Sequence, residues 1–498
     1  MSERSPRSAG LLLHPTSLPG PYGIGDIGPT AFAWIDALAR ARQSWWQTLP
    51  VGPTGYGDSP YQAFSAFAGN VNLLSPELIA GDGLGHPPDP AGRGFSADRV
   101  VYDAVLPYKT AIVNGAWQAF QQGHAPHLRE PFASFRFDHR DWLDDYALFM
   151  AIRDARGGDP WYKWPADLAR RKETALDAAR RELGDAIGPY LFGQFLFFRQ
   201  WAGLRRHAKA RGIGLIGDAP IFVSGDSADV WANPKLFLLD EALRPTVVAG
   251  VPPDYFSPTG QLWGNPVYDW PAHRATGYEW WTRRLRATLD LVDIVRLDHF
   301  RGFCAAWHVP ADHTTAVHGR WMPGPGADLF ARLRSDLGDL PLIAEDLGDI
   351  TPDVYALRDD YGLPGMKVLQ FAFDNPKNAF LPHNYTPNCV AYTGTHDNDT
   401  TRGWFAALPD HPKGLAKRYT GTDGTDIAWD LIRMAWASVA DVAIAPLQDV
   451  LGFGTEARMN VPGTAQGNWQ WRMPASAFDD DHIRRLADLT DLYARVRE

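Results

Sequence analysis

The sequence has only two cysteines, Cys304 and Cys389, among its 498 residues. Two cysteines exclude a disulfide framework and a cysteine-rich zinc site, so we interpret both as reduced thiols that pack as small apolar side chains. The sequence also lacks a long hydrophobic run, because its most apolar stretch, 190–198, is too short to span a bilayer. No positively charged apolar leader opens it. We therefore expect a cytoplasmic protein with no membrane partner.

Basic residues are outnumbered by acidic ones. There are 48 Lys and Arg against 58 Asp and Glu, which gives a net charge of −10. A protein that binds nucleic acid typically carries a basic patch or stripe, and we find none, so nucleic acid is excluded as a predicted partner. Hydrophobic types make up 45% of the chain and charged types 21%. This is the composition of a globular protein with ample material for a core.

Eight short apolar runs recur along the chain, and each ends at polar, Gly or Pro residues. Runs of this length are typical of strands that are buried on both faces. They lie at 11–13, 45–50, 213–217, 292–297, 342–344, 367–373, 389–395 and 443–447. Amphipathic stretches at 30–41, 278–289 and 352–361 predict helices between some of them. Eight strands alternating with helices favour an α/β fold, a closed parallel (β/α)8 TIM barrel.

An open, doubly wound sheet is the alternative fold. Such a sheet usually has a glycine-rich phosphate-binding turn after its first strand. Here residues 14–20 read HPTSLPG, and residues 23–25 (GIG) hold only a fragment of the glycine pattern. The barrel is therefore the preferred prediction.

The chain is longer than a barrel requires. A TIM barrel needs about 250 residues, so we expect large inserted subdomains in the loops at its C-terminal face. Residues 51–212, with helical stretches at 142–156 and 175–207, predict an inserted, largely helical subdomain. Residues 219–277 are dense in Pro, Gly, Trp and Tyr and predict an inserted, aromatic-rich loop subdomain. We take 1–498 as a single catalytic barrel domain.

Four of the predicted strands end at an acidic residue or just before one, namely Asp218, Asp298, Glu345 and Asp397. Catalytic groups of a TIM barrel come from the C-terminal ends of several strands. One Asp after a strand is more often a helix cap or a turn residue, but four on one barrel favour a carboxylate cluster. Arg296 precedes Asp298 by two residues, so it faces the same side of the strand and would hold Asp298 ionised.

Two carboxylates across a sugar bond are the working groups of glycoside cleavage. Asp298, next to a cation, suits the nucleophile. Glu345 follows the apolar run 342–344, and a dry setting would raise its pKa, which suits the acid/base. A separation of about 5–5.5 Å between the two would give retention of configuration. Asp397 would then hold ring hydroxyls and stabilise the transition state.

Other chemistries have weaker signals. No HExxH motif and no complete EF-hand loop is present, so we predict neither a metal site nor a cofactor. A GxSxG elbow is absent, which argues against a Ser-His-Asp triad. His396, beside Asp397, could donate to a sugar or to a neighbouring carboxylate, or it could be an ordinary loop histidine.

Aromatic residues interleaved with Gly and Pro suit a glucan, because sugar rings present C–H faces to indole and phenol rings. Loop 55–61 supplies Tyr56 and Tyr61. Stretch 254–265 supplies Asp254, Tyr255, Phe256, Gln261, Trp263 and Asn265. The alternative is that these rings pack in the core, as most aromatic side chains do.

The sequence resembles the amylomaltases, the 4-α-glucanotransferases of the α-amylase clan (glycoside hydrolase family 77). Nine motifs carry this resemblance and appear in family order over about residues 10–473. They are GDSPY (57–61), DAPIFV (218–223), DSADVWANP (226–234), AGVPPDYFS (249–257), GQLWGNP (260–266), RLDHFRG (296–302), AEDLG (344–348), GTHDNDT (394–400) and ARMNVPG (457–463). Ala219 stands where the family usually has Leu, a change that we expect to be harmless.

The resemblance implies an inserted barrel without a C-terminal β-domain. It implies Asp298 as nucleophile, Glu345 as acid/base and Asp397 as transition-state stabiliser. The substrate-binding residues that it implies are Asp218, Arg296 and His396 at the donor sugar, Tyr61, Gln261, Trp263 and the loop 254–257 along the groove, and His299 and Asn460.

The implied activity is the transfer of α-1,4-glucan segments between maltooligosaccharides, or starch or glycogen fragments, by a retaining double displacement. Glucose is a further implied acceptor, and cyclic glucans are potential products. Three alternatives remain open: an α-glucan hydrolase of the same clan, a noncatalytic glucan-binding protein and a metal-dependent barrel hydrolase.

Overall fold

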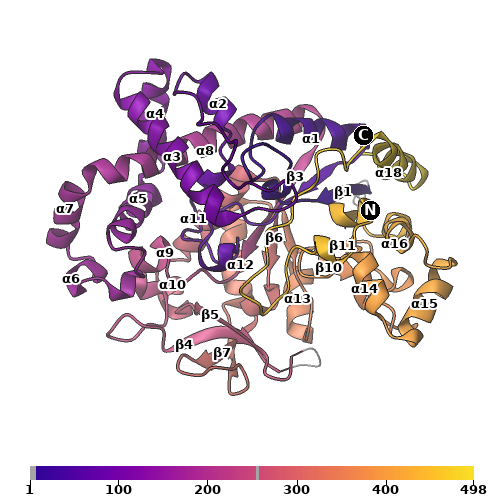
Figure 1. Ribbon diagram of the computed structural model, residues 1–498. Helices are drawn as coiled ribbons and strands as arrows, with labels where there is room; N and C mark the ends of the chain where they lie inside the picture. Colours follow the sequence, from indigo (N-terminus) through magenta and orange to yellow (C-terminus); the bar gives the residue numbers. More distant parts are fainter. Residues whose placement is uncertain (1–6, 254–256, 498) are drawn as a thin grey trace.

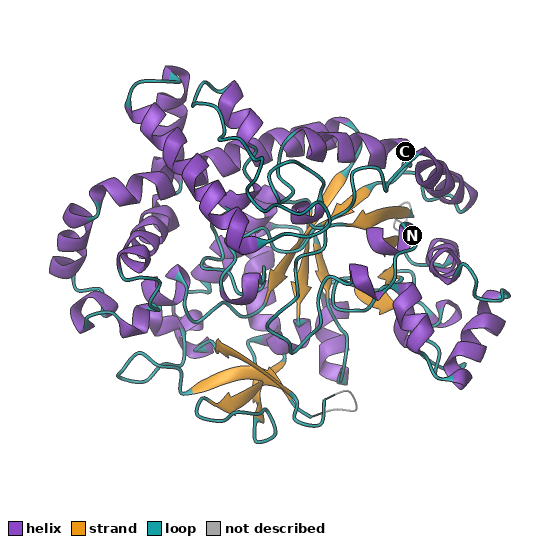
Figure 2. Cartoon of the chain, viewed as in Figure 1, coloured by secondary structure: helices purple, strands orange, loops and turns teal. Residues whose placement is uncertain are grey.

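A computed structural model of the protein describes residues 7–253 and 257–497. At its centre, eight parallel strands close into a barrel in the order β1-β12-β11-β10-β9-β6-β3-β2. Each of the eight apolar runs supplies one strand, so the predicted (β/α)8 barrel is confirmed, with helices around it (Figures 1 and 2). The strands are β1 (Ser8–Leu12), β2 (Trp45–Gln47), β3 (Gly214–Pro220), β6 (Ile294–Asp298), β9 (Leu342–Ala344), β10 (Gly365–Val368), β11 (Cys389–Tyr392) and β12 (Val442–Pro446).

The apolar run 367–373 is longer than the strand that it forms. β10 ends at Val368, and Leu369–Phe371 continue as a 3-10 turn. The turn lets Gln370 donate its side-chain amide to the carbonyl of Asp399 at 2.9 Å. The predicted boundary is wrong because apolarity reports burial, and a buried turn is as apolar as a buried strand.

The three helices predicted between strands are present as α1 (Pro29–Arg40), α11 (Glu279–Leu291) and α13 (Pro352–Asp360). α1 has Pro at its first position, where the missing N–H costs no hydrogen bond, and it buries Trp34 and Leu38. α11 begins one residue later than predicted because Tyr278 has a left-handed backbone, with φ 57°. The other helices around the barrel are α12 (Gly326–Leu337), α14 (Thr401–Ala407), α15 (Asp410–Thr420), α16 (Ile427–Ala437), α17 (Leu447–Val450) and α18 (Asp480–Leu492).

The connection between β2 and β3 is largely helical and extends to one side of the barrel (Figure 1). Its helices are α2 (Pro76–Gly81), α3 (Tyr102–Gln121), α4 (Arg129–Asp138), α5 (Arg140–Ala155), α6 (Ala166–Ala169), α7 (Glu173–Glu182) and α8 (Gly184–Ala210). The stretch 175–207, expected to be helical, falls in two helices that Leu183 separates. Phe120 and Phe192 stack at 4.6 Å and join α3 to α8. The division of this region into a subdomain stays a prediction.

The segment 219–277 contains more regular structure than the expected loops. It holds two short helices and two strands, α9 (Ala228–Ala232), β4 (Val247–Val251), β5 (Gln261–Pro266) and α10 (Trp270–Ala275). These strands join β7 (Ala305–Pro310) and β8 (Arg320–Pro323) in an antiparallel sheet of order β5-β4-β7-β8. The sequence did not reveal this sheet, because half of its strands come from beyond the segment.

The two ends of the chain meet at the N-terminal end of the barrel. β1 pairs with β12, the last strand, over Ser8–Leu12. Arg495 is fully buried, and its guanidinium donates to the carbonyls of Ser8 at 3.0 Å, Trp436 at 2.6 Å and Ser438 at 3.0 Å. The C-terminal segment thereby ties the first strand to the end of α16.

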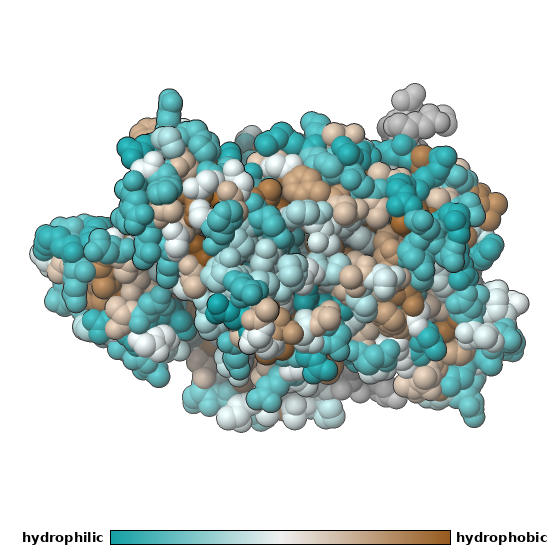
Figure 3. All heavy atoms as spheres, turned by 45° about the horizontal axis from the view of Figure 1, so that its top comes forward, coloured by the Kyte–Doolittle hydropathy of each residue, from teal (hydrophilic) through white to brown (hydrophobic). Residues whose placement is uncertain are grey.

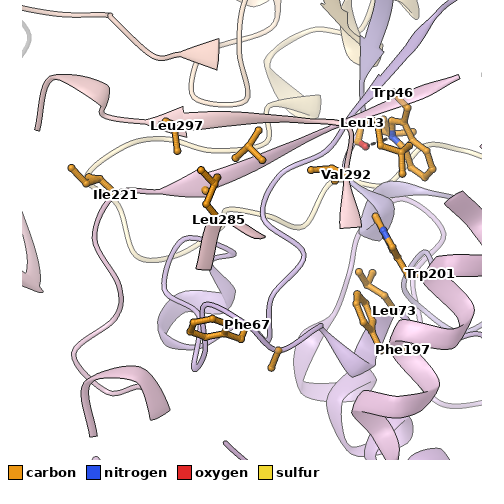
Figure 4. Close-up of a cluster of buried hydrophobic side chains, with 14 of the residues drawn as sticks. Leu13, Trp46, Phe67, Leu73, Phe197, Trp201, Ile221, Leu285, Val292 and Leu297 are labelled. Carbon is orange, nitrogen blue, oxygen red and sulfur yellow. Dashed lines mark hydrogen bonds between the residues drawn. The ribbon is translucent and has the colours of Figure 1, made fainter. Parts of the chain in front are cut away.

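The core lies between the barrel strands and the outer helices. Figure 4 shows part of it, with Leu285, Val292 and Leu297 among the buried side chains. In the same view Trp46 donates its indole N–H to the carbonyl of Leu13 at 2.8 Å. The surface in Figure 3 is mostly hydrophilic, with apolar residues scattered over it. In the part of the chain that the structure describes, no helix has both the length and the apolarity needed to cross a membrane.

Candidate active site

The sheet register brings the acidic strand ends together at the barrel mouth. β3 pairs with β6 so that Asp218 lies opposite Arg296 and Pro220 opposite Asp298. β6 pairs with β9 so that Leu297 lies opposite Ala344, the residue before Glu345. Because the strands are parallel, their carboxyl ends share one rim. Asp298 and Glu345 therefore leave neighbouring strands at the same level, and Asp218 lies two residues earlier on β3.

Arg296 is the cation at the centre of this group. Its side chain is 4% exposed, and its Nη1 lies 2.7 Å from Oδ2 of Asp218 and 3.0 Å from Oδ1 of Asp298. Tyr61 donates its hydroxyl to the same Asp218 oxygen at 2.9 Å. The two-residue spacing in the sequence predicted that Arg296 and Asp298 share a face of β6, and their ion pair fits that prediction.

Glu345 is held by two backbone N–H groups. The N–H of His299 donates to its Oε2 at 2.7 Å, and the N–H of Leu347 donates to its Oε1 at 3.0 Å. His299 directly follows Asp298 and has a left-handed backbone with φ 52°, a conformation that costs a non-glycine residue free energy. The turn at His299 thus fixes the Glu345 carboxyl next to the end of the strand that carries Asp298.

Burial has the largest effect on the pKa values of Asp298 and Glu345. Burial raises the pKa of Asp298 to about 8, although the Arg296 guanidinium opposes the rise, and the charges of Asp218, Glu345 and Asp397 add to it. Burial also raises the pKa of Glu345, again against Arg296. Several buried carboxylates share the one cation, so Arg296 offsets only part of the effect of burial on Asp298. The coupled pair is therefore expected to retain a proton near neutral pH.

Asp397 lies on the other side of the mouth, after β11. Asn460 donates its amide to Oδ1 of Asp397 at 2.6 Å, and Nε2 of His396 lies 3.4 Å from the same oxygen. The Asp397 side chain is 43% exposed. His396 stacks on Tyr61 with ring centroids 5.2 Å apart, so Tyr61 joins the Asp397 side of the mouth to Asp218. Of the alternatives left open for His396, the structure places it against a neighbouring carboxylate.

β5 carries the aromatic residue Trp263 next to His299. Trp263 packs edge-to-face on His299 at 4.8 Å and donates its indole N–H to Oε1 of Gln261 at 3.2 Å. Asn265 differs from these residues, since it is buried and its amide donates to the carbonyl of Val223 at 2.9 Å. Three further predicted binding residues lie outside the described part of the chain, namely Asp254, Tyr255 and Phe256.

Two residues near the site had no assigned role in the sequence. Arg458 donates to the backbone carbonyl of Asp397 at 2.7 Å, and the ARMN run that contains it was the available signal. Trp469 packs on Tyr61 at 5.7 Å and on His396 at 6.0 Å, and no local pattern marks it. Within residues 7–253 and 257–497, no group of three or more His, Cys, Asp or Glu side chains is arranged to hold a metal ion.

Comparison with known proteins identifies the family. The family model described as 4-alpha-glucanotransferase matches residues 13–477. The 4-alpha-glucanotransferase of Thermus thermophilus is 50% identical over 500 residues, which cover 99% of each chain. The chain belongs to the 4-α-glucanotransferase family. The resemblance found in the sequence is confirmed, and so is the transferase activity that it implies.

Other 4-α-glucanotransferases agree with this assignment. The Synechocystis enzyme is 50% identical over 496 residues, which cover 98% of each chain. The solved amylomaltase of Streptococcus agalactiae, a complex with acarbose, matches with a TM-score of 0.95 at 38% identity and covers 98% of this chain and 99% of its own. The fold and the activity thus rest on matches over nearly the whole chain.

Proposed function

We propose that this 4-α-glucanotransferase moves α-1,4-glucan segments between maltooligosaccharides by a retaining double displacement at Asp298 and Glu345. The proposal rests on one observation, that neighbouring groups of the same strand end hold both carboxyls in place. Arg296 pairs with Asp298 at 3.0 Å, and the N–H that follows Asp298 donates to Glu345 at 2.7 Å. The acarbose bound by the Streptococcus agalactiae amylomaltase supports a sugar ligand for the same mouth.

In the first step, Glu345 gives its proton to the oxygen of the bond to be cleaved while Asp298 attacks the anomeric carbon. The reducing-end fragment leaves as an alcohol, and the nonreducing segment stays as an ester of Asp298. In the second step, Glu345 takes the proton of an acceptor 4-hydroxyl, which attacks the same carbon and releases Asp298. Two inversions give overall retention.

The proton that Asp298 and Glu345 share suits these two reaction steps. The ion pair with Arg296 favours the anion on Asp298, which leaves the proton to Glu345. Once Glu345 has given up the proton, the N–H groups of His299 and Leu347 stabilise its carboxylate. The carboxylate is then ready to act as the base of the second step.

Asp397 is proposed to hold ring hydroxyls and to stabilise the oxocarbenium-like transition state. Its side chain is partly exposed, and Asn460 and His396 lie against its Oδ1. Contacts with Asp397 would strengthen as positive charge develops on the sugar ring. They would therefore lower the activation free energy of the reaction more than they tighten substrate binding.

The acceptor decides between transfer and hydrolysis. Trp263, Gln261 and Tyr61 are proposed to line the glucan groove, and glucose is proposed as the smallest acceptor. Good orientation of a reacting group is worth about 7–11 kcal/mol of barrier, so a well-held acceptor can outcompete water. By the same argument, cyclic products are expected only from donors that are long enough to bring their own 4-hydroxyl to the anomeric carbon.

The test is incubation with maltotriose, with and without added glucose, followed by chain-length profiling. A ladder of longer oligomers supports transfer, whereas shorter sugars alone would indicate the related hydrolase. Asp298→Asn should abolish turnover while glucan binding persists. Asp293→Asn, at the opposite end of β6, is the matched control and should keep the ladder, since Asp293 pairs with Arg205 away from the mouth. Turnover retained by Asp298→Asn would remove it from the nucleophile role.

A further inference from the structure

A small cavity lies behind His396, on the side of the barrel mouth formed by β1, β11 and β12. Its volume is about 20 Å³. A cavity needs about 10–15 Å³ to hold a water molecule, so there is room for one. Its polar lining includes His14, Thr395, His396, Asn398, Gln448 and Arg458.

Among the residues that line this cavity, His14 has a buried polar atom that the rest of the structure leaves unexplained. It follows β1 and is 5% exposed, and its Nδ1 is buried without a hydrogen-bond partner among the described residues. Most buried polar side-chain atoms in proteins have a partner, which is protein or ordered water. Burial is the main cause that lowers the pKa of His14 to about 3, so its imidazole is neutral.

His396 lines the same cavity and also lies next to Asp397. Its Nε2 lies 3.4 Å from Oδ1 of Asp397, and burial lowers its pKa, so the ring is neutral. A carboxylate only accepts, so Nε2 must carry the ring proton if it is to donate to Asp397. Nδ1 is then an acceptor, and the partner of Nδ1 decides which tautomer His396 adopts.

A single water molecule would satisfy both rings. Water offers two donors and two acceptors, so it can donate to Nδ1 of His396 and still bond to Nδ1 of His14 in either tautomer of His14. Asn398 and Gln448 in the lining have protein partners, since Asn398 accepts from the N–H of Thr395 at 2.8 Å and Gln448 donates to the carbonyl of Ala457 at 3.3 Å. The two carboxylates of the lining accept from hydroxyl groups, Asp449 from Thr393 at 2.6 Å and Asp399 from Thr455 at 2.8 Å.

We propose that this cavity is a built water site and that His14, through the water it holds there, positions His396 against Asp397. His14 is thus a positioning residue, and it touches no substrate. The water site stands on the cavity and on His14 alone, whereas the effect on turnover rests on the proposed role of Asp397.

The water site is tested first, by high-resolution diffraction from the native enzyme. An ordered water within about 2.7–3.2 Å of Nδ1 of His14 is expected. A dry cavity, or a water that bonds to neither imidazole, would overturn the proposal. This measurement is independent of activity, so it stands whether or not the carboxylates act as proposed.

The positioning role is tested by kinetics of maltotriose disproportionation. His14→Phe keeps a ring of similar shape and removes both nitrogens, and it should lower kcat about tenfold or more while KM changes little, as expected of misplaced catalytic groups. His14→Gln, which restores a polar atom, should recover most of the loss. The matched control is His273→Phe, since His273 is another fully buried histidine with unpartnered nitrogens and lies away from the mouth.

A double-mutant cycle decides whether His14 acts through His396. In a His396→Asn background, His14→Phe should change kcat less than about twofold, because its target is already gone. The same loss in both backgrounds would show that His14 acts elsewhere and would overturn the proposal. If His14→Phe does not fold, His14→Gln in both backgrounds makes the same comparison. A native enzyme that gives no transfer ladder would instead refute the proposed function.

Discussion

The backbone N–H of His299 donates to Oε2 of Glu345 at 2.7 Å, so the residue after Asp298 on β6 holds the carboxyl that follows β9. The geometry depends on the left-handed backbone of His299, with φ 52°. The spacing of the two carboxyls is therefore set by one strained turn, as is common at catalytic sites.

The acid role of Glu345 is separable from its packing. Glu345→Gln keeps the size of the side chain but has no proton to give to the leaving oxygen. Turnover of maltotriose should fall about 10²–10⁴-fold, the usual contribution of a general acid. A maltosyl fluoride donor needs no acid, so release of fluoride should persist. Equal losses with maltotriose and with the fluoride would contradict the acid role.

Removal of the central cation should change the pH profile. Arg296 lowers the pKa of Asp298 and of Glu345, so Arg296→Gln should raise both. The acidic limb of the kcat/KM profile should move to higher pH, because more of the Asp298 population is then protonated at a given pH. The profile, measured from pH 5 to 9, checks this. Arg205→Gln is the control, since Arg205 pairs with Asp293 away from the mouth. An unmoved limb would separate Arg296 from the titration.

Asp298 should destabilise the fold at alkaline pH. Its pKa in the folded protein is about 8, against 3.8 in the unfolded chain. The folded state therefore binds more protons between these values, and stability falls as pH rises through this window. Asp298→Asn removes this penalty and should raise the free energy of unfolding at pH 9 by about 0.5–2 kcal/mol, with little effect at pH 4. Urea titrations at the two pH values make the comparison, and a gain that is larger at pH 4 would contradict it.

Trp263 should affect the acceptor more than the donor chemistry. Trp263→Ala removes the ring that packs on His299, and should weaken acceptor binding about three- to tenfold. The ratio of hydrolysis to transfer should rise, because water competes better with a loosely held acceptor. Trp263→Phe should restore most of the transfer. Product profiles at several glucose concentrations measure the ratio, and a ratio unchanged in Trp263→Ala would remove this residue from the groove.

Arg495 should be essential for stability and irrelevant to chemistry. Arg495→Ala leaves several buried carbonyls without their donor and should cost about 3–5 kcal/mol of unfolding free energy. Arg497→Ala, which removes only a cation over the ring of Trp45 at 5.2 Å, should cost less than about 1 kcal/mol. Equal midpoints of chemical denaturation for the two variants would contradict the role of Arg495.

Local sequence patterns predicted the barrel because each buried parallel strand is a continuous apolar run. The acidic residues after these runs predicted the carboxylates at the mouth, and the two-residue spacing predicted that Arg296 and Asp298 are paired. The β5-β4-β7-β8 sheet could not be predicted in this way. β4 pairs with β5, which follows it closely in the sequence, and with β7, which lies much further along the chain.

Features that depend on three-dimensional neighbours were also beyond the sequence. The pKa of Asp298 depends on Asp218 and Asp397, which come from other strands, and the surroundings of His14 are set by loops that follow β11 and β12. No local pattern reports how many carboxylates share one cation.

The pairing of β1 with β12 and the contact of Arg495 with Ser8 join residues up to 487 positions apart. At a synthesis rate of roughly 5–20 residues per second, the first strand is made roughly 20 to 90 seconds before β12, the strand that pairs with its second edge. Throughout that time one edge of β1 is unpaired and open to association with other nascent chains. Yield in the cell should therefore depend on chaperone supply and translation speed more than the stability of the finished barrel would suggest.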